Sequence, residues 1–490
     1  MSLATESAAR TTFRLVGFLF ALELVSGILQ GFYVPLIPDL VDHLGIRDAD
    51  FNWFEAAQLL LSALVVPILA KLGDMFGHKR ILLISTVLTA GATWWLAFTG
   101  DFTSFLIAWA LQGFYVVWLP LEVALIFDRG RKSGTAASAT RRAAGFLVVA
   151  LELGAIAGAL AGGRVFTATG ESVPITLIIP AIAVTLVFFA VLFGVPESEP
   201  LPNRRLDWRG FALLSLALIL VTAGLAFLKL STTAGSEWMT PTGIGLIGLG
   251  ALMFIPFVRF ELKQDDPAID MRVLARPTMW PIMLTAALVG ISLLGAQAPL
   301  STFAGTDRAE VGYGLSLDSS NISYLIGAYL ISLVIGAVVY PTAAKHLSPR
   351  IALIGAAILV AIGYSLFLPF HDTVPQVFTN MIIAGIGSGA LVAALPSAAA
   401  AAAPRGQTGV ATGLTNTTKT IGGSFASAVF AIVLAVGVTA TVSSTASSLS
   451  GYLTVFAICG GGAIAAAIVL FFVPKTAFGD AVEVTEPPLP

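Results

Sequence analysis

The sequence predicts an all-α protein that crosses a lipid bilayer many times. Of its 490 residues, 57% are hydrophobic and only 11% are charged, and the mean hydropathy is +0.91. A soluble domain carries roughly a quarter charged residues, so most of this chain is expected to lie out of contact with water. About fourteen apolar stretches have the length of roughly 20 residues that a spanning helix needs. Basic residues are concentrated in alternate connections, and segments of the two halves of the chain resemble each other, as in a duplicated helical bundle.

The apolar stretches follow one another along the chain, separated by short polar connections. We expect spanning helices at 13–38, 53–72, 80–100, 102–127, 139–165, 173–195, 210–230, 241–260, 278–303, 321–344, 350–370, 374–402, 408–437 and 449–473. An even number of spans places both termini on the same side of the membrane.

Lysine and arginine are shared unequally between the two sets of connections. The poorer set holds only Arg47, Arg164, Lys229 and Arg308, whereas the other set and the two terminal segments hold most of the other basic residues. Basic residues are retained on the cytoplasmic side of a membrane protein. We therefore expect both termini in the cytoplasm and a location in the cytoplasmic membrane.

An internal repeat divides the chain. "LPLEVALIFDRGRKSG" (119–134) and "LPSAAAAAAPRGQTG" (395–409) share Leu-Pro, Arg-Gly and Ser/Thr-Gly in the same order. We expect an N-terminal six-helix bundle over 1–195, a linker with two extra spans over 196–276, and a C-terminal six-helix bundle with a cytoplasmic tail over 277–490. In duplicated transporters the substrate site lies between the repeats, near the middle of the membrane.

Several function classes have no motif in this sequence. The net charge of −2 and the lack of a basic arm argue against nucleic acid as a partner. The single cysteine, Cys459, excludes an internal disulfide or a CxxC metal site. The sequence contains none of GxxxxGK[ST], GxSxG and HExxH, so we expect neither an ATP-driven pump nor a hydrolase, no enzyme activity and no cofactor.

The stretch "AKLGDMFGHKR" (70–80) interrupts the apolar pattern between the second and third spans. Glycines at 73 and 77 are expected to let the backbone turn tightly. Asp74 is expected to accept from backbone N–H groups at a helix start or to pair with a cation on a neighbouring helix. Lys79 and Arg80 are expected to hold the loop at the inner surface. The alternative is an ordinary positive loop without a further role.

The same stretch resembles the loop motif of the major facilitator superfamily, G-x-L-x-D-R-x-G-R-K/R. Leu72, Asp74, Gly77 and Lys79 match it, whereas Ala70, Met75 and His78 depart from it. The resemblance implies the major facilitator fold, with two six-helix bundles related by a pseudo-twofold axis. It also implies a gating loop that latches the two halves together, formed by Asp74, Gly77, Lys79 and Arg80.

Other stretches are similar to the fourteen-span drug/proton antiporter branch of that family: "RLDWRGFALL" (205–214), "DDPAIDMRVLARP" (265–277) and "GVATGLTNTTKTIGGSFASAV" (409–429). The resemblance implies export of drugs, lipids or secondary metabolites in exchange for protons. In "WALQG" (109–113), Trp109 stands where the family usually has an arginine tied to proton coupling. This departure leaves open a weakly coupled or uncoupled lipid or natural-product exporter, or a transporter-like sensor without flux.

Three glutamates inside the predicted spans are the expected proton-coupling residues, with Glu122 ranked before Glu152 and Glu23. Burying an ionisable side chain in a membrane costs about 2.5–3.5 kcal/mol on insertion scales, so such a residue needs a partner or a function. The alternative is structural pairing, of Glu152 with an arginine of its own span or of Glu122 with Lys419. Glu55, near the outer end of the second span, is expected to be solvated.

Spans one, four and five face the central cavity in the superfamily, which implies a cavity wall that includes several polar and aromatic residues of this chain. The expected cavity residues are Gln30, Tyr33, Trp109, Gln112, Tyr115, Arg141, Gln297, Asn416 and Lys419. The alternative for the aromatic rings is a lipid-facing position.

Three glycines in the fifth predicted span have the small-xxx-small spacing of close helix packing: Gly154, Gly158 and Gly162. We expect them to let a neighbouring helix approach closely, a contact that would also seal one end of the pathway. We further expect a monomer whose partners are the bilayer, protons and an amphipathic substrate.

Overall fold

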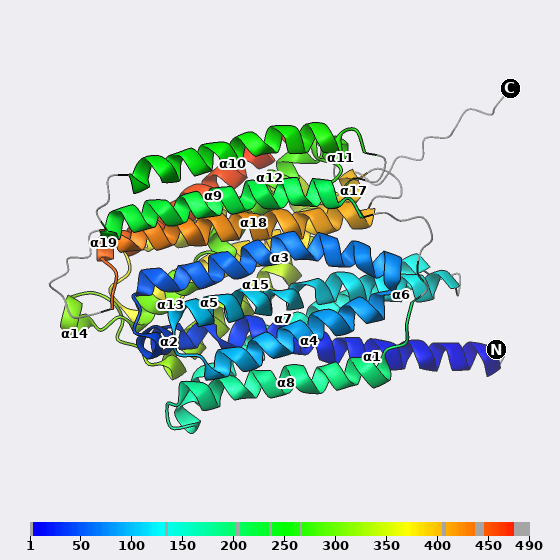
Figure 1. Cartoon of the computed structure of the whole chain (residues 1–490), viewed down its shortest axis with the longest axis horizontal. Helices are drawn as coiled ribbons and strands as arrows, with labels where there is room; N and C mark the ends of the chain where they lie inside the picture. Colours follow the sequence, from blue (N-terminus) through cyan, green and yellow to red (C-terminus); the bar gives the residue numbers. More distant parts are fainter. Residues whose placement is uncertain are drawn as a thin grey trace.

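The computed structural model describes residues 3–132, 136–198, 200, 206–234, 238–264, 267, 269–403, 408–436 and 445–474. Side chains are described for the same residues except 3–14, 129–132, 136–144, 232–234 and 408–410. Helices lie side by side along the longest axis of the molecule, and the first and last described residues lie at the same end of it, which is called the end of the termini below (Figure 1). Within these ranges fourteen helices are long and apolar enough to cross a membrane, and there is no strand.

The first half of the chain contributes six spans. Their elements are α1 (Leu3–Phe32), η1 (Val34–Leu36), α2 (Ile37–Leu44), α3 (Asp48–Phe76), α4 (His78–Phe98), α5 (Phe102–Gln112), η2 (Gly113–Val117), α6 (Trp118–Lys132), α7 (Ala136–Ala168) and α8 (Val173–Gly194). Within this N-terminal half, α1 packs along α7, and α4 packs along α8.

The last six spans form a second bundle. Its elements are α11 (Met271–Leu274), α12 (Trp280–Leu293), α13 (Gln297–Gly305), α14 (Arg308–Val311), α15 (Ser319–Leu347), α16 (Pro349–Leu366), α17 (Val374–Ala402), α18 (Thr408–Ala435) and α19 (Leu449–Leu470). Here α17 packs against α15 and α16, and α19 packs against α16 and α12.

The contacts between the two halves have the symmetry of a duplicated bundle. The second span of the N-terminal half, α3, packs along the fifth span of the C-terminal half, α18. The fifth span of the N-terminal half, α7, packs along the second span of the C-terminal half, α15. A twofold axis between the halves exchanges these two contacts, as the repeated sequence segments predict.

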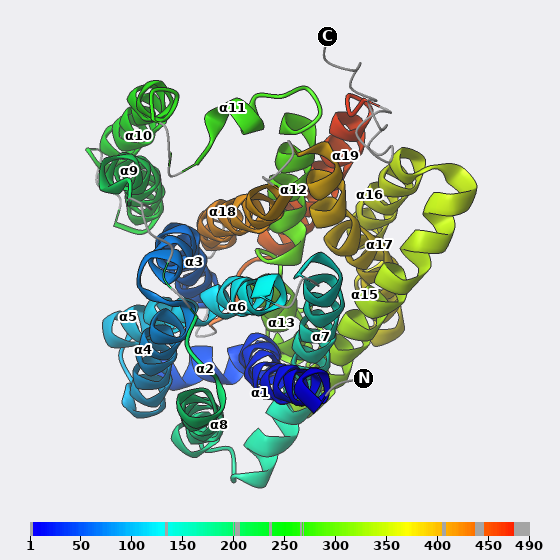
Figure 2. The same ribbon diagram turned by 90° about the vertical axis from the view of Figure 1, so that its right-hand side faces the viewer.

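The two extra helices, α9 (Trp208–Ala234) and α10 (Met239–Glu261), form a hairpin outside both bundles (Figure 2). They pack on each other, and α9 also contacts α18 and α3. Near the end opposite the termini, Lys229 of α9 forms an ion pair with Asp50 of α3, and its ammonium lies 6.0 Å from the centre of the Trp53 ring. The hairpin therefore covers the seam between α3 and α18 from outside.

Three spans that the sequence predicts as continuous are interrupted in the structure. The first breaks into α1, η1 and α2 around Pro35, the fourth is a 3-10 helix over Gly113–Val117, and the ninth breaks between α12 and α13. Hydroxyl groups bond to carbonyls near these breaks: Ser62 Oγ donates to the carbonyl of Gly113, and Ser301 Oγ donates to that of Val34. Such bonds replace those that a regular helix would make, which is necessary away from water.

Hydrogen bonds join the two halves at the end opposite the termini. Tyr452 of α19 donates to the carboxylate of Asp48 at the start of α3, at 2.6 Å. The N–H of Gly163 on α7 donates to Ser323 Oγ on α15, at 3.0 Å. The structure is therefore closed between the halves at this end of the molecule.

Candidate functional site

A cavity lies between the two halves, beside all three interrupted spans. It contains about 470 Å³ of empty space, including its opening to solvent. Its walls come from α1, η1, α3, α5 and η2 of the N-terminal half and from the α12–α13 break of the C-terminal half, through Leu29, Gln30, Tyr33, Val34, Glu55, Gln58, Leu59, Trp109, Gln112, Tyr115, Leu294 and Gln297. Interrupted helices are a common way to present polar groups at a site within a membrane.

Six of the expected cavity residues lie together in this wall: Gln30, Tyr33, Trp109, Gln112, Tyr115 and Gln297. Two others, Asn416 and Lys419, are half-buried on α18 and do not line this cavity. Arg141 is part of α7, but its side chain lies outside the described residues.

Side chains of the wall hold one another in place. The Gln112 amide donates to the Tyr33 hydroxyl at 2.8 Å and to Thr93 Oγ1 at 3.2 Å. The Gln58 amide donates to the Trp109 carbonyl at 3.2 Å and to Gln112 Oε1 at 3.3 Å. These bonds connect α1, α3, α4 and α5, so that the N-terminal side of the cavity has a defined shape.

The aromatic residues of the wall are inside the protein rather than at the lipid surface. Trp109 is 3% exposed, and its ring centre lies 5.1 Å from that of Tyr33, 5.3 Å from that of Phe51 and 5.6 Å from that of Phe105. Where the family usually has an arginine, this chain therefore has part of an aromatic cluster, which supplies no charge.

The prediction that Glu55 is solvated is wrong. Its side chain is only 8% exposed and lines the cavity. The residue lies on α3, one helical turn before Gln58 and two before Ser62, so the three share one face of that helix. This polar stripe is a signal in the sequence that could have identified both Glu55 and Gln58 as site residues.

Glu23 on α1 and Glu122 on α6 form a pair of neighbouring carboxyls deeper in the N-terminal half. Both side chains are 0% exposed, and the two groups interact electrostatically. Among the described residues, none outside the pair is hydrogen-bonded to any of their carboxyl oxygens. Glu122 does not pair with Lys419 in this structure, so that predicted alternative is wrong.

Lys419 interacts instead with the third glutamate, Glu152. Glu152 lies on α7 and Lys419 on α18, so the opposite charges attract each other between the two halves. Each half therefore contributes one charge to an attraction that changes when the halves separate or approach.

Three glycines of α7 lie where that helix touches the backbone of α1: Gly154, Gly158 and Gly162. A Cβ atom at these positions, taken in that order, would lie 2.0 Å from the carbonyl oxygen of Leu24, 2.7 Å from that of Ile28 and 2.4 Å from that of Phe32. Backbone contact this close requires residues without side chains. The small-xxx-small spacing therefore corresponds to a packing contact inside the N-terminal half, and not to one between the halves.

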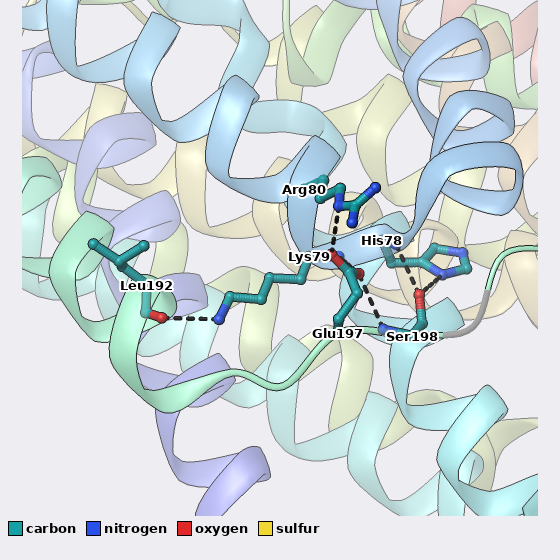
Figure 3. Close-up of polar contacts among 6 residues, drawn as sticks. All are labelled: His78, Lys79, Arg80, Leu192, Glu197 and Ser198. Atoms are coloured by element: carbon teal, nitrogen blue, oxygen red, sulfur yellow. Dashed lines mark hydrogen bonds and ion pairs between the residues drawn. The ribbon is translucent and has the colours of Figure 1, made fainter.

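The loop between α3 and α4 contacts the end of α8 and the segment that directly follows α8 (Figure 3). The Lys79 ammonium donates to the carbonyl of Leu192 at the end of α8 at 2.8 Å, and the Lys79 N–H donates to Glu197 Oε1 at 2.9 Å. Asp74 lies 3.2 Å from the His78 ring, whose other nitrogen is 2.7 Å from Ser198 Oγ. In this structure the loop thus holds the segment that follows α8, and no latch to the second half involves these contacts.

The predicted roles of the two loop glycines are only partly right. Gly77 has a φ of 103°, and a Cβ there would lie 2.6 Å from Glu197 Oε1, so this glycine makes the turn. Gly73 instead lies inside α3, where a Cβ would meet the Leu121 side chain at 2.7 Å. Close packing, and not a turn, explains the absence of a side chain at Gly73.

Replacing Glu197 by alanine is expected to lower the free energy of unfolding by about 1.5–3 kcal/mol, because its carboxylate accepts from backbone N–H groups. Those donors are Lys79 and Ser198, at 2.9 and 3.0 Å. Arg80→Ala is the matched control: its guanidinium is 3.6 Å from the same carboxylate but 70% exposed, and exposed ion pairs contribute at most about 1 kcal/mol. Thermal unfolding of the purified proteins measures the loss of stability in both variants. Equal decreases in unfolding temperature would contradict the stabilising role given to the Glu197 hydrogen bonds.

Comparison with known proteins places this geometry in a family. A family model described as Major Facilitator Superfamily matches residues 19–427. A triacylglyceride transporter of Mycobacteroides abscessus is 26% identical over 398 residues, which are 78% of this chain and 74% of that protein. The cephamycin export protein CmcT of Amycolatopsis lactamdurans is 27% identical over 422 residues, covering 84% of this chain and 82% of the relative.

Solved structures of transporters have the same fold. The human organic anion transporter MFSD10 (TETRAN) superposes with a TM-score of 0.60 at 17% sequence identity, covering 94% of this chain and 99% of that one. The nucleoside transporter NupG gives a TM-score of 0.60 at 14% identity, covering 94% and 98%. The predicted fold class is confirmed.

Proposed function

This chain belongs to the major facilitator superfamily, and we propose that it is an exporter of amphipathic small molecules that exchanges them for protons by alternating access. The cavity between the halves would hold the substrate, because interrupted spans of both halves present polar and aromatic side chains to it. The cephamycin export protein among the relatives supports outward transport. The charge distribution along the chain supports cytoplasmic termini and a position in the cytoplasmic membrane.

The Glu23–Glu122 pair is the observation on which proton coupling depends. Two carboxylates side by side in a buried site repel each other, and binding of one proton relieves that repulsion. Both groups are buried and without hydrogen bonds to other described residues, so they are not occupied by a structural ion pair. Proton binding would thereby change the relative stability of the inward-open and outward-open states.

The alternation itself would be a rocking of one half against the other. The structure is closed at the end opposite the termini, through contacts such as Tyr452 to Asp48. If the termini are cytoplasmic, this is the state that takes up substrate from inside the cell. The attraction between Glu152 and Lys419, on different halves, would contribute to the energy difference between the states.

Transport in proteoliposomes tests this function. The panel is ethidium, Nile red and anilinonaphthalene sulfonate, which are amphipathic fluorophores of positive, neutral and negative charge. We expect at least one to move faster when a pH gradient is imposed, with protons moving the opposite way. If the transport rate of every compound is the same with and without the pH gradient, proton antiport is excluded. If no compound is transported, a transporter-like sensor is favoured.

A second candidate is an uncoupled or weakly coupled lipid exporter. Two observations favour it: Trp109 is part of an aromatic cluster where the family usually has an arginine, and one of the relatives is named a triacylglyceride transporter. Transfer of a fluorescent triacylglycerol between proteoliposomes and acceptor vesicles, at equal rates with and without a pH gradient, would support this candidate.

A further inference from the structure

We propose that the α9–α10 hairpin holds the molecule closed at the end opposite the termini, and that the ion pair between Lys229 and Asp50 must break when this end opens. The inference rests on the rocking of the two halves in the proposed function, but on neither a substrate nor proton coupling. It assigns a role in the conformational cycle to the two helices that lie outside both bundles.

The two helices of the hairpin are packed so closely that they move as one unit. A Cβ atom at Gly224 of α9 would lie 2.6 Å from the carbonyl oxygen of Gly243 on α10. Further along, a Cβ atom at Gly250 of α10 would lie 2.8 Å from the carbonyl oxygen of Ala217 on α9. Backbone contact at two levels resists sliding or separation of the two helices. A force on one end of the hairpin is therefore transmitted to the other end.

At the end of the termini, the hairpin is attached to the C-terminal half. The Arg272 guanidinium of α11 donates to the carbonyl of Leu262, directly after α10, at 2.8 Å. The Glu261 carboxylate at the end of α10 accepts from the N–H of Ile269 at 3.2 Å. Both partners belong to the segment that leads into α12, the first span of the C-terminal half. Because α9 also packs on α18, we expect the hairpin to move with the C-terminal half.

Near the opposite end, the hairpin binds the N-terminal half. Lys229 of α9 pairs with Asp50 in the first turn of α3, and the two side chains are only 14% and 22% exposed. One helical turn earlier, Leu225 packs against a small buried cluster that includes Trp53 of α3 and Ala431 of α18. Opposite charges that are partly removed from water attract each other more strongly than charges on a solvated surface.

The first turn of α3 is thus held from two sides. The Asp48 carboxylate accepts from Tyr452 of the C-terminal half, and Asp50, two residues later, pairs with the hairpin. When α3 and α18 separate at this end, a hairpin that stays with the C-terminal half has to release Asp50. The ion pair therefore stabilises the closed arrangement relative to the open one. If the hairpin instead followed the N-terminal half, the pair would persist in both arrangements and favour neither.

Distances between two nitroxide labels, measured by pulsed electron paramagnetic resonance, test the inference without any transport. The full-length protein in lipid nanodiscs carries the labels on Thr103→Cys of α5 and Glu310→Cys of α14, which are exposed positions near the end opposite the termini, one on each half. The only native cysteine, Cys459, is fully buried and does not compete for the label. A shorter and a longer distance represent the closed and the open arrangement.

Lys229→Met should raise the ratio of open to closed molecules at least about threefold, within the range of measured pairwise couplings. Asp50→Asn should have a similar effect, because it removes the same pair while its side-chain oxygen can still accept from the N–H of Arg47. The double variant should differ no more from the unmodified protein than either single variant does, since all three lack the one interaction. Lys229→Arg, which keeps the charge, should retain the original ratio.

Lys263→Met is the matched control, because it removes the same charge from an exposed position at the other end of the hairpin. Its ratio should equal that of the unmodified protein. The inference is overturned if Lys229→Met and Asp50→Asn both behave like this control, or if their effects add in the double variant. Should Lys229→Met fail to fold, Asp50→Asn compared with the control decides. Two distances in unaltered proportions would leave the rocking of the halves intact, whereas a single short distance in every protein would contradict the rocking as well.

Discussion

Glu122→Gln should abolish the acceleration of transport by a pH gradient while leaving substrate binding in place. Glutamine has nearly the same shape as glutamate but cannot exchange a proton. In the variant, the neighbour of Glu23 would be a neutral amide instead of a second carboxyl. Proton binding would then no longer relieve repulsion between two carboxylates. Gradient-driven flux of the fluorophore that the unmodified protein transports should fall at least about tenfold, a change of only about 1.4 kcal/mol in the barrier.

The control for this prediction is Glu122→Asp, which keeps an exchangeable proton and should retain part of the gradient dependence. Proton release on substrate binding, followed with a pH-sensitive dye, gives a second measurement that does not require flux. If Glu122→Gln transports like the unmodified protein and still releases protons when substrate binds, Glu122 has only a structural role. Unchanged flux in both variants, with no gradient dependence, would instead support the uncoupled lipid exporter.

Gly154→Ala should be the most destabilising single methyl addition among the three packed glycines of α7. The new Cβ would lie 2.0 Å from the backbone oxygen of Leu24, closer than the corresponding approach at Gly158 or Gly162, and backbone cannot move aside as a flexible side chain can. Overpacking of this kind costs about 1–3 kcal/mol and occasionally more. Because α1 also carries Glu23, separating α1 from α7 would displace the proton-coupling pair as well. We therefore expect both a lower unfolding temperature and a loss of gradient-driven flux.

Gly145→Ala on the same helix is the matched control. A Cβ at Gly145 would meet no heavy atom within 4 Å, so this substitution should be neutral or slightly stabilising through helix propensity. Size-exclusion chromatography after heating, monitored by fluorescence, compares the two variants in detergent. Equal thermal stability of Gly154→Ala and Gly145→Ala would show that α1 and α7 do not pack as closely as this structure indicates.

The sequence was sufficient for the fold because the membrane imposes simple requirements on it. In lipid the backbone hydrogen bonds must be made inside the protein, and mostly within each helix, so length and apolar content alone are enough to predict fourteen spanning helices. The repeated Leu-Pro and Arg-Gly segments indicated the two halves. Gln112 and Tyr115, which the family resemblance places in the cavity wall, both line the cavity.

The places where spans break were not predictable in the same way. The carbonyl of Gly113, where the 3-10 segment begins, accepts a hydrogen bond from Ser62 of α3, and near the break after α12 the Tyr364 hydroxyl of α16 donates to the carbonyl of Ser292. Their contribution appears only when the helices are assembled. The prediction for Glu55 fails for the same reason, because a position near the end of a span in the sequence gives no information about the helices that cover the side chain.

By itself, then, the sequence determined the number of spans, the duplication and the set of charged residues that lipid does not tolerate without a partner. The tertiary structure alone decided what each buried charged group lies near. Glu122 is beside Glu23, Lys419 is attracted by Glu152, and Glu55 lines the cavity. The physical reason is that the two properties depend on interactions between different parts of the chain. Insertion into lipid depends on each segment alone, whereas pairing between charges depends on positions of a few ångströms that are set by packing between distant parts of the chain.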